Sequence, residues 1–559
     1  MLRWHGMWTA LSSNNYHSLP HDLLPYQEYM KGCWVRRVYF DKMMKNHDGG
    51  EAQLERLIDF LFHQNCNAIE EVNFSVSNIK SITFSHLKSL CRNSLTRISI
   101  SLPDDDSFNG SNATPYMILL HYPNLNQLYY AGPMQQQQPS SSIPVTNFKH
   151  QHLRNLTLNI FNIEGNIELR PILFAIPNLE QLRLNLQCIE HTIVSLLMSI
   201  FSDKFCPNVT TLILVGCCKN NIKLVDYGHE WRGKSTPCMK MINKTKQGNH
   251  FKNKYNGLRH LMLHDPSEKY HMTILQTLHY IIPQSHNTLE TLHLSGSYKL
   301  HGNETMELLS QYIFPCLERL YLINGRYHNL MAYGNTRLFR IFAENSVPSL
   351  TTLKLMGLDS DYHIELPVLA SSLNYVQEIH FEDCPEILPY TLVNFFNQLG
   401  ENGRVIIDNP NGTNKERSLD HKEQKKHTMS RIILRNMPGV NYDTLITIFQ
   451  KCCLEELVVQ ECDDLDMDDI GRLLDTLVEN RGLKKLDLIL IYHQPRFYFF
   501  ARKVPVYPDP IMIQEILPKI DSRCIEWRLE LKDYSQNDAD PVCQIYDHME
   551  YRGQKLLAH

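Results

Sequence analysis

The sequence predicts an α/β solenoid, in which every repeat contributes one strand to a parallel sheet and one helix to a covering layer. Three observations lead to this prediction. A motif of three apolar residues, the second lying three positions and the third five positions after the first, recurs along most of the chain. The stretches between copies have the apolar spacing of amphipathic helices. From residue 69 onward most copies start 25 to 33 residues apart, which suits one strand and one returning helix per repeat.

The motif predicts strands because its second and third apolar residues are two positions apart and therefore share one face of an extended chain. The residue between them points to the other face, so one side of each strand belongs to the core and the other meets solvent. The clearest copies start at Leu153, Leu179, Val209, Leu258, Leu289, Leu317, Leu350, Val376, Leu454 and Leu483. Looser copies start at Val35, Ile69, Leu95, Leu125 and Met429.

The segments between strands predict helices. Their apolar residues recur at three- and four-residue spacing, as a helix needs if it is to cover one side of a core. The spacing is clearest over 193–201, 305–314 and 468–478, and a proline or glycine follows each of these segments. The predicted repeat is therefore strand, turn, helix and turn.

Three copies carry a cysteine eight positions after their first apolar residue, at Cys217, Cys384 and Cys462. With the segment 454–466, Leu-Glu-Glu-Leu-Val-Val-Gln-Glu-Cys-Asp-Asp-Leu-Asp, these residues resemble the leucine-rich repeats, and among them the cysteine-containing, ribonuclease-inhibitor-like kind found in F-box proteins. The resemblance covers about residues 35–531. It implies a horseshoe with a parallel concave sheet and helices on the convex face, and it implies that the cysteine lies in the turn leaving each strand.

The repeats predict one long solenoid domain over 34–535, because each repeat of a solenoid packs only against its neighbours. An N-terminal cap over 1–33 and a C-terminal tail over 536–559 flank this domain. Insertions that do not follow the repeat pattern are expected near 135–148, 219–256 and 408–428.

The resemblance raises the question of an F-box, the helical module that precedes the repeats in F-box proteins and docks on a Skp adaptor. Ser18–Leu24 looks like the opening of that module, but Trp34–Phe40 already looks like a repeat strand and leaves no room for the remaining helices. Trp4 and Trp8 offer a second interpretation, as the remnant of the module's last helix. In a third, these two tryptophans only cap the core of the first repeat. The F-box is thus expected to be absent or truncated, and a Skp adaptor is a partner only where an F-box is present.

The sequence predicts no enzyme, no cofactor and no metal site. It contains no G-x-S-x-G, H-E-x-x-H or C-x-x-C motif. The adjacent pairs Cys217-Cys218 and Cys452-Cys453 lack the spacing that lets two thiolates face one metal ion. The acidic run over 463–469 lacks the glycine and the closing glutamate of a calcium loop, and it suits the start of a helix.

The expected compartment is the cytoplasm or the nucleus, with no membrane partner. No stretch of the sequence approaches the roughly 18 uninterrupted apolar residues of a membrane helix. The segment Met1–Trp8 lacks the apolar core of a secretory signal. The 15 cysteines are accordingly expected to be reduced thiols.

Candidate binding residues come from the position between the second and third apolar residues, which points away from the core. In chain order this position holds Thr157, Arg183, Ile213, Met262, His293, Tyr321, Lys354, His380, Ile433, Val458 and Asp487. Aromatic and cationic side chains dominate many protein–protein contacts. The predicted partner-binding residues on the concave face are therefore Arg183, His293, Tyr321, Lys354 and His380. The alternative for each is an ordinary exposed strand residue.

The sequence leads to a non-catalytic recognition protein, which presents a protein substrate to a Skp-cullin-F-box ubiquitin ligase. A leucine-rich repeat scaffold or inhibitor without ties to ubiquitin is the alternative. A weaker alternative is a nucleic-acid binder that uses the 219–256 insertion, where nine Lys and Arg stand against two acidic residues. A solvated loop is the favoured explanation of that insertion, since the whole chain has a formal net charge of -5.

Overall fold

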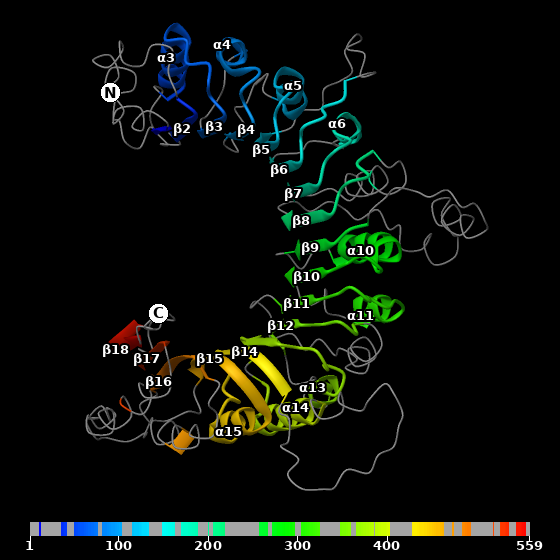
Figure 1. Cartoon of the computed structure of the whole chain (residues 1–559), viewed down its shortest axis with the longest axis vertical. Coiled ribbons are helices and arrows are strands. Elements are labelled where there is room, and N and C mark those ends of the chain that lie inside the picture. The colour runs from blue at the N-terminus through cyan, green and yellow to red at the C-terminus, as the bar shows by residue number, and fades with distance from the viewer. Residues whose placement is uncertain are drawn as a thin grey trace, which may run out of the picture. The chain divides into compact units, whose positions relative to one another are not determined.

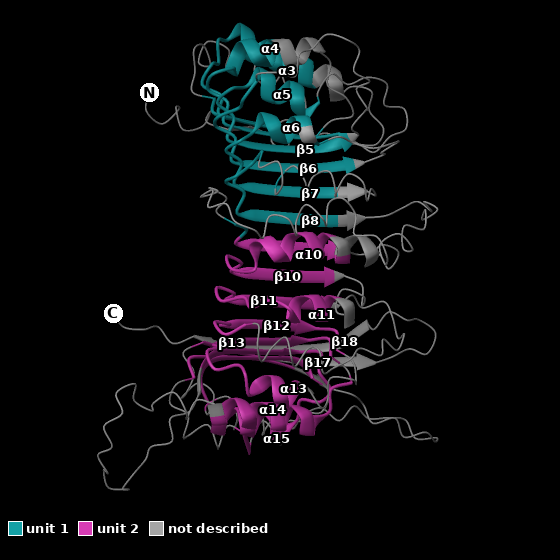
Figure 2. Cartoon of the chain, turned by 90° about the vertical axis from the view of Figure 1, so that its right-hand side faces the viewer, with its two compact units in different colours: residues 1–258 teal, residues 259–559 magenta. Residues whose placement is uncertain are grey.

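The structure of the chain is a computed structural model. It describes residues 10–12, 35–41, 50–75, 81–102, 114–133, 148–161, 169–187, 200, 205–217, 257–265, 271–296, 303–324, 347–358, 365–384, 386–402, 427–462, 472–473, 483–492, 518, 526–535 and 544–554. Contacts divide the chain into two compact units, Met1–Leu258 and Arg259–His559 (Figure 2). The two units are described separately below.

The first unit is a parallel sheet with helices along one side. Each strand pairs in parallel with the next one in the chain. The strands are β1 (Ala10–Ser12), β2 (Arg37–Asp41), β3 (Glu71–Ser75), β4 (Arg97–Ser101), β5 (Gln127–Pro133), β6 (Asn155–Phe161), β7 (Gln181–Gln187) and β8 (Thr211–Cys217). The helices are α3 (Gly50–His63), α4 (Ser81–Cys91), α5 (Pro115–His121) and α6 (Arg170–Ala175), and they lie on one side of the strands (Figure 1).

The second unit repeats this arrangement. Its strands are β9 (His260–Asp265), β10 (Thr291–Gly296), β11 (Arg319–Asn324), β12 (Thr352–Met356), β13 (Glu378–Glu382), β14 (His427–Arg435), β15 (Cys452–Cys462), β16 (Lys485–Tyr492), β17 (Glu526–Ser535) and β18 (Gln544–Gln554). From β9 to β17 neighbours are parallel, whereas β18 runs antiparallel to β17. The helices are α10 (His271–Ser285), α11 (Asn303–Ser310), α13 (Glu365–Ala370), α14 (Pro389–Asn402) and α15 (Tyr442–Lys451).

The register of the strands confirms the α/β fold with a parallel sheet that the apolar motif predicts. Leu292 of β10 lies opposite Leu261 of β9 on one side and Leu320 of β11 on the other. These three side chains are 0 to 2% exposed. Because a strand alternates its side chains between two faces, the apolar residue two positions later in each strand is also directed into the core. Successive repeats therefore share one continuous core between the sheet and its helices.

The turn leaving the strand explains the cysteine position of the motif. Four consecutive repeats place a residue with positive φ at the end of the strand. Gly357 (73°), Asp383 (52°) and Asn436 (47°) directly follow β12, β13 and β14, and Glu461 (57°) lies at the register shift just before the last residue of β15. This left-handed step directs the next side chain into the core, and these next residues are Leu358, Cys384, Met437 and Cys462, all at most 7% exposed. Sγ of Cys384 donates to the Glu382 carbonyl at 3.2 Å, and Sγ of Cys462 donates to the Gln460 carbonyl at 3.5 Å.

Several predicted segments differ from the structure or lie beyond what it describes. The helix expected over 305–314 ends at Ser310, because Gln311 and Tyr312 donate to carbonyls only three residues back and so tighten the last turn. The strand β14 begins at His427, two residues inside the insertion expected over 408–428. In the segment expected to be a tail, β18 extends the sheet. The apolar repeat pattern predicted neither the early start of β14 nor the strand β18.

Other predictions fall on residues outside the description. These are the helix over 193–201 except Ile200, most of the helix over 468–478, the acidic run over 463–469, the first eight residues with their two tryptophans, and 18–34. The insertion 219–256 lies there too, as do 135–147 and 408–426. The nucleic-acid alternative, which depends on 219–256, stays a prediction.

Candidate functional site

The candidate site lies on the face of β9–β17 that points away from the helices, called the open face below. The residue between the two inward apolar positions forms the central row of this face. In register from β9 to β17, this row is Met262, His293, Tyr321, Lys354, His380, Ile433, Val458, Asp487 and Arg528. Four predicted binding residues, His293, Tyr321, Lys354 and His380, thus lie on four consecutive strands.

Arg183, the fifth predicted residue, lies in the first unit. It is on β7, where the register places it opposite Thr157 of β6 and Ile213 of β8. Its side chain is exposed. The register of the second unit brings together the other four candidates and does not include Arg183.

Two contacts organise the four grouped residues. The rings of His293 and Tyr321 lie with their centroids 5.5 Å apart, tilted by 55°. Nζ of Lys354 donates to Oε2 of Glu382 at 3.1 Å, and Nε2 of His380 lies 3.0 Å from the same oxygen without hydrogen-bond geometry. Glu382 is a member of the site that the central row alone does not reveal. It lies on the same face two positions after His380, so the period of two along a strand is the sequence signal that could have found it.

The histidines of the site are held neutral. His380 is 9% exposed, and its burial, aided by the Lys354 charge, lowers its pKa to about 4 although Glu382 acts in the opposite direction. Burial also lowers the pKa of His293 to about 4, with smaller contributions from His264 and Lys354. Because a neutral imidazole can both donate and accept a hydrogen bond, these rings offer polar contacts and no charge at pH 7.

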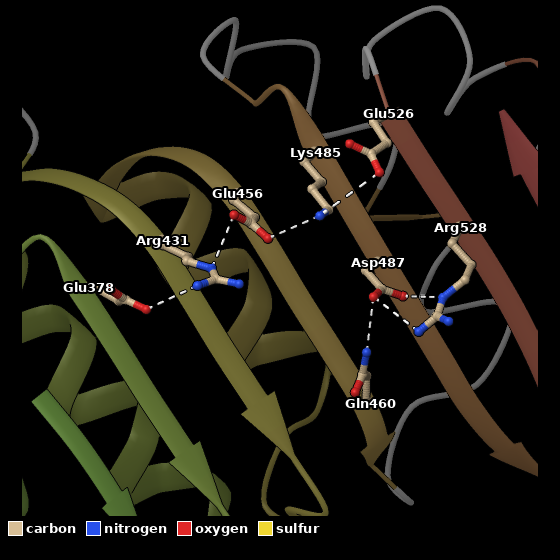
Figure 3. A network of polar contacts seen from close by, with 8 residues as sticks. All are labelled: Glu378, Arg431, Glu456, Gln460, Lys485, Asp487, Glu526 and Arg528. Atoms are coloured by element: carbon tan, nitrogen blue, oxygen red, sulfur yellow. Dashed lines mark hydrogen bonds and ion pairs between the residues drawn. The ribbon is translucent and has the colours of Figure 1, made fainter. Parts of the chain in front are cut away.

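A ladder of ion pairs borders the central row (Figure 3). It crosses five strands and alternates in sign from Glu378 through Arg431, Glu456 and Lys485 to Glu526. The successive nitrogen–oxygen distances are 3.2, 3.1, 3.5 and 3.9 Å. Each cation lies between two carboxylates, so the ladder aligns neighbouring strands even though exposed pairs stabilise weakly.

Asp487 is a carboxylate of this face that pairs with side chains on both neighbouring strands (Figure 3). It accepts two hydrogen bonds from the guanidinium of Arg528, at 2.8 and 3.1 Å, and one from the amide of Gln460 at 3.0 Å. Two parallel bonds between a guanidinium and a carboxylate fix both distance and angle. Asp487 therefore ties β15, β16 and β17 together.

Removing this carboxylate is expected to destabilise the sheet at β15–β17. In Asp487→Ala, Arg528 and Gln460 lose their acceptor, which is expected to cost about 1–3 kcal/mol because the site is only part-buried. Amide hydrogen exchange in β16 and β17 measures this loss. The matched control is Lys484→Ala, which removes an exposed pair with Glu455 at 2.9 Å and is expected to cost under about 0.5 kcal/mol. Equal exchange in the two variants would contradict the prediction.

The central row has an apolar middle. Ile433 and Val458 point away from the helices, but they are only 4% and 3% exposed. Their expected role as exposed strand residues is therefore wrong. Strands in a sheet are about 4.8 Å apart, so a short branched side chain between longer ones is readily covered. Ile489, in the next row, is 6% exposed and extends this apolar patch.

The described residues contain no group of metal ligands and no helix that could span a membrane. In the part of the chain that the structure describes, no three His, Cys, Asp or Glu side chains are grouped to hold a metal ion. Cys452 is buried whereas Cys453 is exposed, so these adjacent thiols point to opposite sides of β15. No helix among the described segments is long and apolar enough to cross a membrane.

Comparison with known proteins assigns no family to this chain. No protein-family model matches it, and no curated protein matches its sequence. Its function must therefore be argued from the open face itself.

Proposed function

We propose that the chain is a non-catalytic recognition module that binds a partner protein on the open face of its second unit. The observation that supports this proposal is the grouping of His293, Tyr321, Lys354 and His380 on consecutive strands, next to the apolar patch of Ile433 and Val458. Protein interfaces place aromatic and cationic anchors around an apolar centre, and a few such anchors supply most of the binding energy.

The repeat pattern supports a more specific form of the proposal. Since the cysteine-containing repeats resemble those of F-box proteins, the bound partner is proposed to be a substrate of a Skp-cullin-F-box ubiquitin ligase in the cytoplasm or nucleus. The chain would act by proximity, holding the substrate while the ligase supplies the catalysis. A scaffold or inhibitor that only masks its partner is the alternative, and it uses the same face.

Photocrosslinking tests whether the open face binds a protein. A benzophenone amino acid replaces Tyr321 in the full chain, and a second variant carries it at Tyr375, a side chain that is 56% exposed between α13 and β13. A specific adduct is expected only from position 321. Introducing Lys354→Glu should reduce that adduct at least about tenfold, since one anchor of roughly 1.4 kcal/mol corresponds to a factor of ten. The same adducts from both positions would contradict the proposal.

Co-purification with a Skp adaptor distinguishes a role in a ubiquitin ligase from a role as scaffold or inhibitor. The chain is expressed with any upstream coding sequence restored and is mixed with a purified Skp adaptor. A stable complex in gel filtration is the expected result. Failure to form it, while the position-321 adduct persists, would refute the ligase role and favour the scaffold or inhibitor.

A further inference from the structure

Arg435 is a cation of the open face that forms no ion pair with any carboxylate in the described part of the chain. It ends β14, and the register places it between Glu382 of β13 and Gln460 of β15. Its side chain is partly exposed, yet its Nε is buried and has no hydrogen-bond partner. Buried donors in native proteins are nearly always paired, so an exception calls for an explanation.

The other described Lys and Arg side chains of the open face on β12–β17 are all paired. Lys354 is bonded to Glu382, Arg431 lies between Glu378 and Glu456, Lys485 lies between Glu456 and Glu526, and Arg528 is bonded to Asp487. Nε of Arg431 also lacks a well-aligned hydrogen bond, but it lies 3.1 Å from a Glu456 oxygen. Among the described residues, no carboxylate forms an ion pair with Arg435. Its nearest acidic neighbour in register, Glu382, is occupied by Lys354 and His380.

The charge of Arg435 acts on His380 of the neighbouring strand β13. The charges of Lys354, Arg435 and Arg431 all lower the pKa of His380, behind the larger effect of burial, and Glu382 alone raises it. His380 is neutral and therefore adds no charge of its own. The buried side chains of Ile433 and Val458 lie one row away, and limited access to water strengthens any ion pair formed there.

We propose that Arg435 receives a carboxylate from the partner protein, and hence that the open face recognises an acidic segment. The inference rests on the proposed function, because it names the chemistry of the partner bound at that face. A guanidinium matches a carboxylate with two parallel hydrogen bonds, which gives geometric selectivity as well as attraction. Lys354 adds a second cation, and the His293–Tyr321 pair offers a flat surface for an apolar neighbour of the acidic residue.

The stability of the free protein provides the first test. If Arg435 serves to bind a partner protein, Arg435→Met removes a buried N–H group that has no hydrogen-bond acceptor among the described residues of the free protein. This variant is expected to leave the Tm unchanged or higher. The matched variant Arg528→Met breaks a formed pair with Asp487 and is expected to lower the Tm by about 2–4 °C. A fall in Tm for Arg435→Met as large as that for Arg528→Met would overturn the proposal, because Arg435 would then serve the fold.

Peptide binding provides the second test. An array of immobilised peptides, each acidic peptide matched by one with Asn and Gln in place of Asp and Glu, is probed with the full chain. The wild type is expected to retain acidic peptides preferentially. Arg435→Gln should reduce that preference at least about tenfold, which corresponds to 1.4 kcal/mol, and Arg435→Lys should retain part of it. Lys484→Gln is the control, because it removes the same charge from a residue outside the open face.

Three outcomes would count against the inference. No preference for acidic over amide peptides would overturn it, and so would a preference for phosphoserine peptides with no retention of acidic ones. An undiminished position-321 adduct in Arg435→Gln would overturn it while leaving the proposed function intact. Loss of any specific adduct at position 321 in the wild type would instead defeat the proposed function itself.

Discussion

Lowering the pH from 7 to 5 is expected to destabilise the sheet around β10–β13. Burial holds the pKa values of His293 and His380 near 4 in the folded protein, below the ordinary value of 6.5. Well above pH 6.5 neither ring is protonated in either state, so their stabilising contribution is fully present. As the pH falls below 6.5, the unfolded chain binds protons that the folded chain does not. Stability is therefore lost between about 6.5 and 4, by about 1–2 kcal/mol per histidine at pH 5.

The charges that face these rings decide the size of this effect. They are His264, Lys354, Glu382, Arg431 and Arg435. Amide hydrogen exchange in β10–β13 at several pH values measures the loss, and the double variant His293→Gln, His380→Gln is expected to flatten the dependence on pH. A matched control, His279→Gln, removes an exposed histidine of α10 and should leave that dependence in place. An unchanged slope in the double variant would refute the prediction.

Replacing Gly439 by alanine is expected to disrupt the packing between the β13 and β14 repeats. Gly439 lies in the turn between β14 and α15, where an added Cβ would stand 2.0 Å from the carbonyl oxygen of Ile387. Ile387 lies in the corresponding turn between β13 and α14. The obstacle is backbone and not a movable side chain, so the two turns must separate. A loss on the order of 3 kcal/mol is expected, at the upper end of overpacking effects.

The midpoint of urea unfolding measures this loss. Gly132→Ala serves as the control, because its Cβ would meet side-chain atoms of Leu102 at 3.1 Å and Tyr130 at 3.2 Å, which can shift slightly. A midpoint for Gly439→Ala as close to wild type as that of Gly132→Ala would show that the turns do not set the repeat spacing. The same spacing places Arg435 beside Glu382, so Gly439→Ala is also expected to weaken binding at the open face.

The repeat pattern predicted part of the candidate site correctly and missed another part. The rule that side chains alternate along a strand correctly placed His293, Tyr321, Lys354 and His380 on one face, and the parallel register put them side by side. Glu382 lies on that face by the same rule, but reading only one residue per strand missed it. The rule does not predict how exposed a side chain is on the face away from the helices. For this reason the expectation that Ile433 is exposed was wrong.

The sequence by itself determined the repeated α/β architecture, because a period of two in apolar residues can be satisfied only by strands that bury one face. The resemblance to leucine-rich repeats implied that Cys384 and Cys462 lie in the turn leaving the strand, whereas the left-handed step that directs them into the core came from the structure. Only the tertiary structure decided which charged side chains form ion pairs with one another. Arg431 and Glu378 are 53 residues apart in the chain, and their pairing depends on the register of β13 against β14. Among the residues that the structure describes, that register also leaves Arg435 without a paired carboxylate, because Glu382 beside it already pairs with Lys354.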